Sequence, residues 1–134
     1  MIPQDDDIFL VGTIKARVDD NRRLTIPRWF RAKMGSPLIL TGWGNSHILR
    51  IYPMTEWRKV VDGVSDLATR DGSSHAVIHN IVSGAVECAA DAYGRITIPA
   101  RLMEYAGIKK NVLIAGQRAY LEVLGMDIRD ALDM

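Results

Sequence analysis

Two short motifs in the sequence place an arginine four residues after an aspartate. Asp19 precedes Arg23 and Asp91 precedes Arg95, each within the pattern Asp-x-x-x-Arg-apolar-Thr-Ile-Pro. A carboxylate at this spacing can accept hydrogen bonds from the amides of a tight turn and from the arginine, which fixes the turn and aims the guanidinium. The planar guanidinium can pair with guanine O6 and N7 or hold a phosphate at two points. The motif therefore predicts a nucleic-acid contact, although one copy alone is equally typical of a capped turn with a weak surface ion pair.

Basic residues gather around the first motif. The whole chain carries a net charge of +1, but residues 12–33 hold seven basic residues against two aspartates, a local charge of +5. Residues 84–105, around the second motif, hold two arginines against three acidic residues, a local charge of −1. Such clustering can create an electropositive surface on a nearly neutral chain. We therefore expect the first motif to be the main nucleic-acid contact and the second to be mainly structural or to lie between subunits.

The two motifs belong to an internal duplication. A shift of 72 positions lays Gly12–Ile26 over Gly84–Ile98. The match fails by two residues at a later loop and is then restored, so that Ile51 meets Val123. A match of this length with self-compensating gaps indicates two copies of one structural unit.

Each copy predicts the same order of elements, β-β-α-β-β. Alternating and β-branched residues on both sides of a polar turn predict a β-hairpin, and a proline followed by a short stretch that ends at glycine predicts a helix. A second hairpin follows. In the first copy these segments are residues 13–18, 23–26, 29–34, 38–41 and 47–52. In the second copy they include a strand that opens near residue 85, a helix at 99–106, and strands at 112–115 and 120–124.

Helices are also predicted outside the two copies of the repeated pattern. One begins with Thr55 as its N-cap and runs to about Leu67, where Gly72-Ser73-Ser74 soon breaks it. A second covers residues 75–82, and a last one is predicted at 126–132. These helices would connect and close the two β-rich units.

The two units are expected to share one core. We assign residues 8–72 to the first unit with its connecting helix and residues 73–134 to the second. With 134 residues and 48% hydrophobic content the chain can form one core of ordinary size, but neither unit alone has enough apolar surface. The sequence therefore predicts an α+β, β-rich fold in which both units pack into one sheet or barrel.

The composition argues for a protein that stays inside the cell. The N-terminus lacks the basic and apolar stretches of a signal peptide, and no apolar run approaches the ~18 residues of a membrane span. The single cysteine, Cys88, agrees with a reducing compartment. We therefore expect a soluble cytoplasmic protein with no membrane partner.

Segments spread along the chain match one known family. They are Phe9-Leu-Val-Gly12, Asp19 to Arg31, Tyr52-Pro53, Glu56-Trp57, Glu87-Cys88, Asp91 to Pro99, Tyr105-Ala106-Gly107 and Glu122. Through them the chain resembles the MraZ family, transcriptional regulators of the bacterial division and cell-wall gene cluster, over residues 9–124. The resemblance implies two tandem AbrB-like β-β-α-β-β units packed into one pseudo-two-fold swapped-hairpin barrel. It also implies a nucleoid-associated homo-oligomer, ring-like in known members, that binds double-stranded DNA at repeated upstream sites and represses its own operon.

The resemblance also carries site residues onto this sequence. The family's DNA-contact signature falls on the two Asp-x-x-x-Arg motifs, and the wider AbrB-like group adds basic positions on the first strand and on the helix after the proline. Two positions depart from the family: Asn21-Arg22 stands where it usually has Lys-Gly, and Met103 where it tends to have arginine. The expected DNA-binding residues are Arg17, Asn21, Arg22, Arg23, Arg31 and Arg95, with Asp19 and Asp91 orienting the hairpins. No catalytic residue, metal or cofactor is expected.

Three other interpretations stay open at the level of sequence. His75 and His79 have the helical spacing of zinc ligands, with Glu87 and Cys88 downstream, which would suit a metal-binding or enzymatic protein. An AbrB-like antitoxin would bind a toxin through its C-terminal region. A purely structural assembly protein would use self-association as its whole function.

Overall fold

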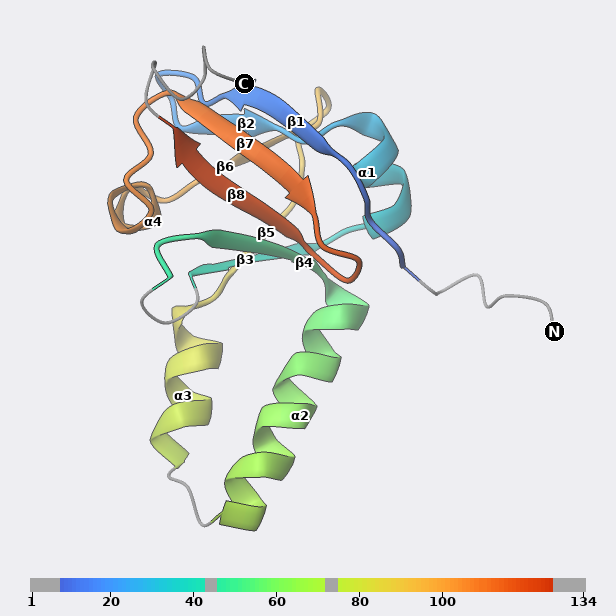
Figure 1. The fold of residues 1–134 in the computed structure, drawn as a ribbon, viewed down its shortest axis with the longest axis vertical. Helices are drawn as coiled ribbons and strands as arrows, with labels where there is room; N and C mark the ends of the chain where they lie inside the picture. Colours follow the sequence, from blue (N-terminus) through green and yellow to red (C-terminus); the bar gives the residue numbers. More distant parts are fainter. Residues whose placement is uncertain (1–7, 43–45, 72–74, 127–134) are drawn as a thin grey trace, which may run out of the picture.

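The fold is mixed α and β, with an antiparallel sheet as its main layer (Figure 1). The computed structural model describes residues 8–42, 46–71 and 75–126. In chain order the elements are β1 (Thr13–Arg17), β2 (Arg23–Thr25), α1 (Arg28–Met34), β3 (Leu38–Gly42), β4 (Leu49–Pro53), α2 (Met54–Asp71), α3 (His75–Gly84), β5 (Val86–Cys88), β6 (Arg95–Thr97), α4 (Ala100–Tyr105), β7 (Asn111–Gly116) and β8 (Leu121–Met126). The predicted order β-β-α-β-β occurs twice, and the predicted β-rich class is confirmed.

Both sheets contain strands from the two halves of the chain. The larger sheet has the order β1-β7-β8-β4-β3-β5, so β1 from the first half lies beside β7 from the second, and β5 lies beside β3. Strands β2 and β6 form a separate two-stranded antiparallel sheet. The predicted hairpins β3–β4 and β7–β8 are confirmed, with Leu40 opposite Ile51 in the first.

The prediction that residues 13–18 and 23–26 pair with each other as a hairpin is wrong. Val18, which follows β1, and Leu24 of β2 form one isolated bridge. The strands themselves pair with strands of the other half, β1 with β7 and β2 with β6. The turn itself forms as expected, since the amide of Asp19 donates to the carbonyl of Arg23 at 3.0 Å. Crossing over in this way brings Leu24 into the common core, where it is fully buried, and so covers apolar surface that one unit could not cover alone.

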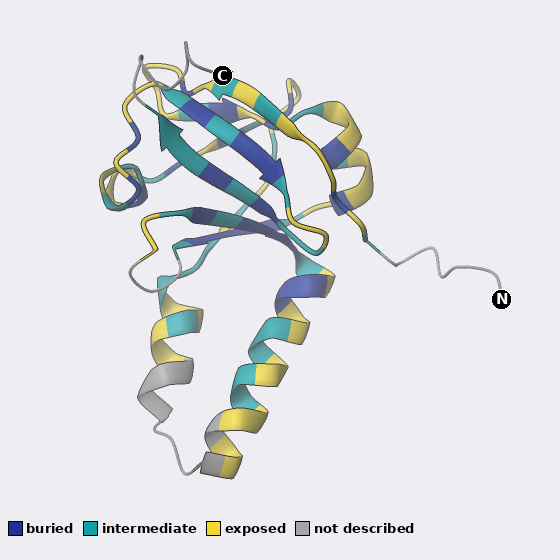
Figure 2. Ribbon diagram, in the orientation of Figure 1, coloured by how far each residue is buried: buried dark blue, intermediate teal, exposed yellow. Residues whose placement is uncertain are grey.

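The core lies between the two sheets and is built from both halves of the chain (Figure 2). Leu24 and Ile96, which face each other in the small sheet, are both 0% exposed. They pack with buried residues of the large sheet and of the short helices. A smaller cluster of Ile39, Tyr52 and Trp57 joins helix α2 to the sheet. Residues from both halves of the chain therefore contribute to the larger cluster of buried side chains.

The short helices α1 and α4 begin directly after Pro27 and Pro99. Proline fits this place because its missing amide would have no partner in the first helical turn. Helix α1 ends at Gly35, whose φ of 70° lies in the left-handed region that glycine enters without steric cost. Each short helix is thus set by the residues that bound it.

The two longer helices lie side by side and project away from the sheet (Figure 1). Helix α2 begins at Met54, immediately after strand β4, so Thr55 lies inside the first turn and is not the N-cap that the sequence suggested. Met126 ends strand β8, so the last predicted helix does not begin there, and the rest of that prediction lies outside the described residues. None of the helices in the described ranges is long and apolar enough to cross a bilayer.

Candidate nucleic-acid interface

The first motif forms a closed hydrogen-bonded turn between β1 and β2. Asp19 Oδ1 accepts from the backbone amides of Asn21 at 2.9 Å and Arg23 at 2.8 Å. Asp19 Oδ2 accepts from Arg23 Nε at 3.1 Å. Arg22, rather than Asn21, takes the left-handed conformation, with φ at 61°. One carboxylate therefore fixes both the turn and the side chain of Arg23.

The second motif repeats this arrangement between β5 and β6. Asp91 Oδ1 accepts from the amides of Tyr93 and Arg95, both at 2.9 Å, and Oδ2 accepts from Arg95 Nε at 2.9 Å. Gly94 takes the left-handed conformation here, with φ at 80°. The guanidinium of Arg95 also lies 5.0 Å from the centre of the Tyr93 ring. The two turns have the same local geometry although their residues differ.

The hydrogen bonds shift the titration of both carboxyl groups. The bond from the Arg23 amide is the largest cause that lowers the pKa of Asp19 below its ordinary value of 3.8. The bond from the Arg95 amide does the same for Asp91. Partial desolvation opposes both shifts. Both aspartates are therefore ionised at neutral pH and keep their arginines in place.

The small sheet joins the two turns and presents their arginines on one face. Arg23 lies opposite Thr97, and Thr25 lies opposite Arg95. Side chains alternate along a strand, so the burial of the intervening residues Leu24 and Ile96 puts these four side chains on the outer face. Arg23 and Arg95 are diagonal neighbours, a position for which the typical separation is about 7–8 Å. The fold thus unites two motifs that lie 72 residues apart in the sequence.

Other predicted site residues surround the first turn. Arg17 ends β1 and is exposed, and together with Asp19, Asp20 and Lys110 it lines a shallow pocket. Lys110 comes from the second half, and its carbonyl accepts from the amide of Val18 at 2.8 Å. Sequence reasoning missed Lys110 because nothing local in the sequence links it to this turn.

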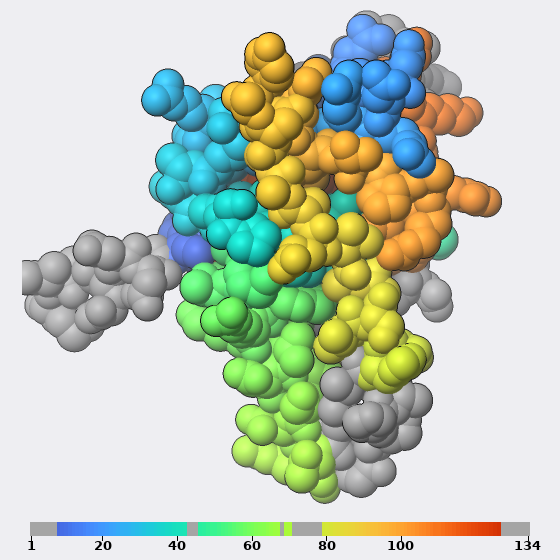
Figure 3. Space-filling model, turned by 180° about the vertical axis from the view of Figure 1, so that it is seen from behind, coloured from blue at the N-terminus to red at the C-terminus, as the bar shows by residue number. Residues whose placement is uncertain are grey.

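Arg31 lies at the second turn and not at the first. Its Nε donates to the carbonyl of Ile26 at 2.9 Å, and its side chain crosses Gly94 so closely that a Cβ there would lie 2.5 Å from the guanidinium carbon. Figure 3 shows the first half, in blue and cyan, against the second, in yellow and orange, on the face seen from behind. The charge of −1 counted for residues 84–105 therefore left out the guanidinium of Arg31, which lies at the second turn. The sequence signal for this contact was the glycine itself, since position 22 carries arginine in the other copy.

The possible metal ligands lie elsewhere in the fold. His79 is exposed on α3, while the side chain of His75 lies outside the described residues. Burial raises the pKa of the Cys88 thiol to about 11, with a smaller effect from Glu87. Among the residues that the structure describes, no three of histidine, cysteine, aspartate and glutamate are grouped so as to hold a metal ion.

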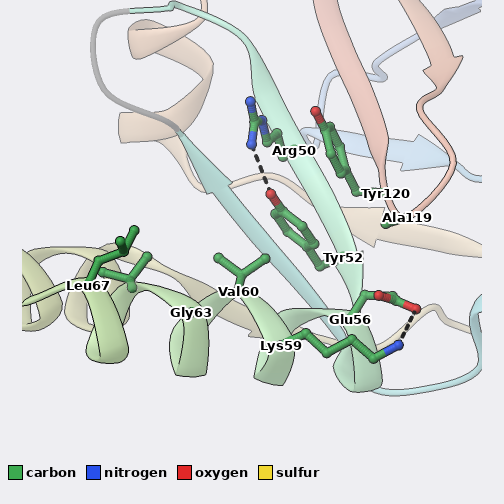
Figure 4. Close-up of a pocket in the computed structure, with 10 residues that line it drawn as sticks. Arg50, Tyr52, Glu56, Lys59, Val60, Gly63, Leu67, Ala119 and Tyr120 are labelled. Carbon is green, nitrogen blue, oxygen red and sulfur yellow. Dashed lines mark hydrogen bonds and ion pairs between the residues drawn. The ribbon is translucent and has the colours of Figure 1, made fainter. Parts of the chain in front are cut away.

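A groove of about 460 Å³ runs between α2, strand β4 and the loop that precedes β8 (Figure 4). Val60, Val64 and Leu67 of α2 form one wall, and Tyr52 and Tyr120 lie across from them. Arg50 closes one end, donating to the Tyr52 hydroxyl at 2.9 Å and lying 4.5 Å from the centre of the Tyr120 ring. Its mainly apolar lining suits the packing of apolar side chains better than acid–base chemistry.

Comparison with known proteins agrees with this geometry. A family model described as "MraZ protein, putative antitoxin-like" matches residues 9–78 and 81–127, and so covers both turns. A protein of Halothermothrix orenii named "Transcriptional regulator MraZ" is 35% identical over 115 residues, which is 86% of this chain and 80% of the relative. The protein of the same name from Pelotomaculum thermopropionicum is 36% identical over 119 residues, 89% of this chain and 81% of the relative. With the family model matched over nearly the whole length and relatives of this identity, the chain belongs to the MraZ family of transcriptional regulators.

Proposed function

We propose that this protein is a sequence-specific regulator that binds double-stranded DNA through the outer face of the β2–β6 sheet. The observation that supports the proposal is that Arg23 and Arg95, each hydrogen-bonded to the aspartate of its own turn, lie on that one face. A two-stranded antiparallel ribbon is narrow enough to enter the major groove of B-DNA. Arginines on its outer face would then meet the edges of the bases.

The way in which each arginine is held favours recognition of guanine. Asp19 and Asp91 bond to Nε of their partners, so these bonds do not use the two terminal nitrogens that a bidentate contact would require. A side chain that is already ordered loses less entropy when DNA binds. Because the aspartates neutralise part of the charge, the face would discriminate among sequences more than it would bind any DNA tightly.

The finer parts of the proposal rest on the family. We infer that residues 8–72 and 73–134 are two AbrB-like units in a swapped-hairpin barrel, which is consistent with the strand order across the two halves. We also propose that the protein represses the division and cell-wall cluster from repeated sites upstream of its own gene, in the nucleoid. Repeated sites suit several weak ribbons on one assembly, because each further contact adds avidity. A regulatory role of this kind requires no catalysis.

Self-association is part of the same proposal. Leu67 on α2 is 57% exposed and Val82 on α3 is 46% exposed, and both helices project from the sheet (Figure 1). A second copy that packs against this helical pair would cover them. We expect Leu67→Glu to reduce the oligomer mass in sedimentation velocity, and Arg58→Ala, which changes the net charge equally from an exposed site on α2, to leave it unchanged. If both variants sediment like the unmodified protein, the helical pair is not the interface.

The function is tested by fluorescence anisotropy of DNA from upstream of the gene, with a scrambled duplex as control, at two salt concentrations. Tight binding of the upstream duplex alone, weakened by salt because bound counterions are released, is the expected result. Absence of binding to either duplex at low salt would refute the DNA-binding role. Binding of a protein toxin in place of DNA would then favour the antitoxin interpretation.

A further inference from the structure

Each half of the molecule places a helix side chain against the turn of the other half. Arg31 of α1 lies against Gly94 in the turn between β5 and β6. Ile26 connects the two, because its carbonyl accepts from Arg31 Nε at 2.9 Å while its amide donates to the Gly94 carbonyl at 2.9 Å. The guanidinium of Arg31 is thus fixed against the second turn by the backbone that also fixes that turn.

The equivalent contact at the first turn has exchanged its residue types. The amide of Ile98 donates to the carbonyl of Arg22 at 2.8 Å, which is the same backbone bond. Here the turn residue is Arg22 and the helix residue, 72 positions after Arg31, is Met103. Arg22 is exposed, whereas Met103 packs partly buried against the core. At the second turn the guanidinium therefore comes from the helix across it, and at the first turn it comes from the turn itself.

The close approach explains why arginine stands at only one position of each contact, either in the turn or on the helix across from it. At Gly94 a Cβ would lie 2.5 Å from both Nε and Cζ of Arg31, far inside the normal contact distance. A residue other than glycine in the turn would thus displace the guanidinium from the position that it takes across Gly94. Met103 is compatible with Arg22 because methionine is flexible and needs no hydrogen-bond partner in a partly buried site.

We propose that the turn residue and the helix residue across from it form an exclusive pair, in which only one of the two is arginine. This pair determines whether the guanidinium that each turn has in addition to Arg23 or Arg95 comes from the turn or from the helix. Gly94 is the positioning residue that admits Arg31 to the second turn, and Met103 is the residue that makes room for Arg22 at the first. This inference rests on the proposed function, and it makes the second turn a DNA contact in its own right. Arg95 there is bonded to Asp91, and Arg31 lies against Gly94 of the same turn.

The two guanidiniums differ in how firmly they are held. Arg31 is partly buried and bonded through Nε, while Arg22 is exposed on a turn. We expect the bonded Arg31 to contact a base and the exposed Arg22 to contact a phosphate, a contact that carries no sequence information. The two turns of one chain would consequently contact DNA differently.

The exclusive pair is tested first without DNA, by thermal unfolding of Met103→Arg, Arg22→Gly and the double variant. We expect Met103→Arg to lower Tm by several degrees, because the new guanidinium would meet the Arg22 side chain. Adding Arg22→Gly should restore most of that loss, because it recreates at the first turn the glycine–arginine pair of the second turn. Strict additivity of the two Tm changes would overturn the pairing.

Arg31 is tested on DNA with Arg31→Met and a matched control, Lys33→Met, which removes one positive charge from another side of the same helix. We expect Arg31→Met to weaken the specific complex about 5- to 150-fold, the range for losing one bidentate base contact, and to reduce preference over the scrambled duplex. Equal effects of the two variants would refute the role of Arg31. If the unmodified protein binds no DNA, the proposed function fails, whereas the thermal test of the pair still stands.

Discussion

The backbone amide of Val18 donates to the carbonyl of Lys110 at 2.8 Å, which joins the end of the first strand to the second half of the chain. On either side of Val18, β1 pairs with β7 and β2 pairs with β6, so neither strand has its main partner within its own half.

Residues 8–72 expressed alone should therefore fail to fold. Their two first strands would lose their ladder partners, and the core residues Leu24 and Ile26 would be exposed to water. Circular dichroism and amide hydrogen exchange check this, with the full chain as control. A stable, cooperatively unfolding fragment would show that the exchange of strands is not needed for folding.

Arg23→Ala and Arg95→Ala should both abolish or strongly weaken specific DNA binding while leaving Tm nearly unchanged. The two side chains are similarly exposed, at 33% and 27%, and lie on the same face of one small sheet. Loss of a bidentate base contact corresponds to about 5- to 150-fold in affinity. Anisotropy titration measures this, with Arg58→Ala on α2 as the control.

The charge of the linear sequence predicted a smaller loss for Arg95→Ala than for Arg23→Ala. The position of Arg31 at the second turn argues instead for comparable losses. A loss confined to Arg23→Ala would support the first expectation and assign the second turn a structural role.

Asp19→Ala should weaken DNA binding without removing the arginine that binds. The variant loses the acceptor of three hydrogen bonds, so the Arg23 side chain is no longer held in place before DNA binds. Ordering this side chain on binding should lower the affinity for DNA roughly 2- to 12-fold. Asp19→Asn keeps one acceptor oxygen for the turn amides and should lie between the two. If Asp19→Ala binds DNA as tightly as the unmodified protein, the carboxylate does not orient Arg23.

The turns should also respond to acid in one direction. The pKa of Asp19 and that of Asp91 are lowered in the folded protein, so the stability that their hydrogen bonds contribute is present above the unfolded value of 3.8. That contribution is lost as the pH falls below 3.8 and through the folded pKa values. Carboxyl resonances followed by NMR titration should give both pKa values below 3.8. A normal or raised value would contradict the hydrogen bonds of that turn.

Cys88 should react slowly with thiol reagents in the native protein. Burial raises its pKa to about 11, so only a small fraction is thiolate at pH 8. The rate of reaction with a chromogenic disulfide should rise markedly when the protein is unfolded in urea. A native rate equal to the unfolded rate would show that the thiol is accessible and ionised.

The local elements could be predicted from the sequence because local rules decide them. Pro27 and Gly35 bound the first short helix, and the alternating strands β3 and β4 pair across a short loop. Asp19 reaches its turn amides through only four residues of chain. In each case the partners are close in sequence, so spacing and residue type are sufficient.

The contacts between the halves could not be predicted in this way. The pairing of β1 with β7 depends on which strand buries more apolar surface in three dimensions, and both candidate partners have similar patterns. The same applies to Arg31, which local charge counting assigned to the first turn. Only the crossing of the strands brings its helix to Gly94.

The presence of both turns in one polypeptide has a consequence for how such a protein can evolve. In a dimer of identical single units, any substitution at the turn would appear twice and the two sites would remain equal. Here position 22 carries arginine while position 94 carries glycine, so each turn has changed independently of the other. With both turns in one chain, the proposed DNA-binding face need not be symmetric, and its two ends can be selected separately for different sequences.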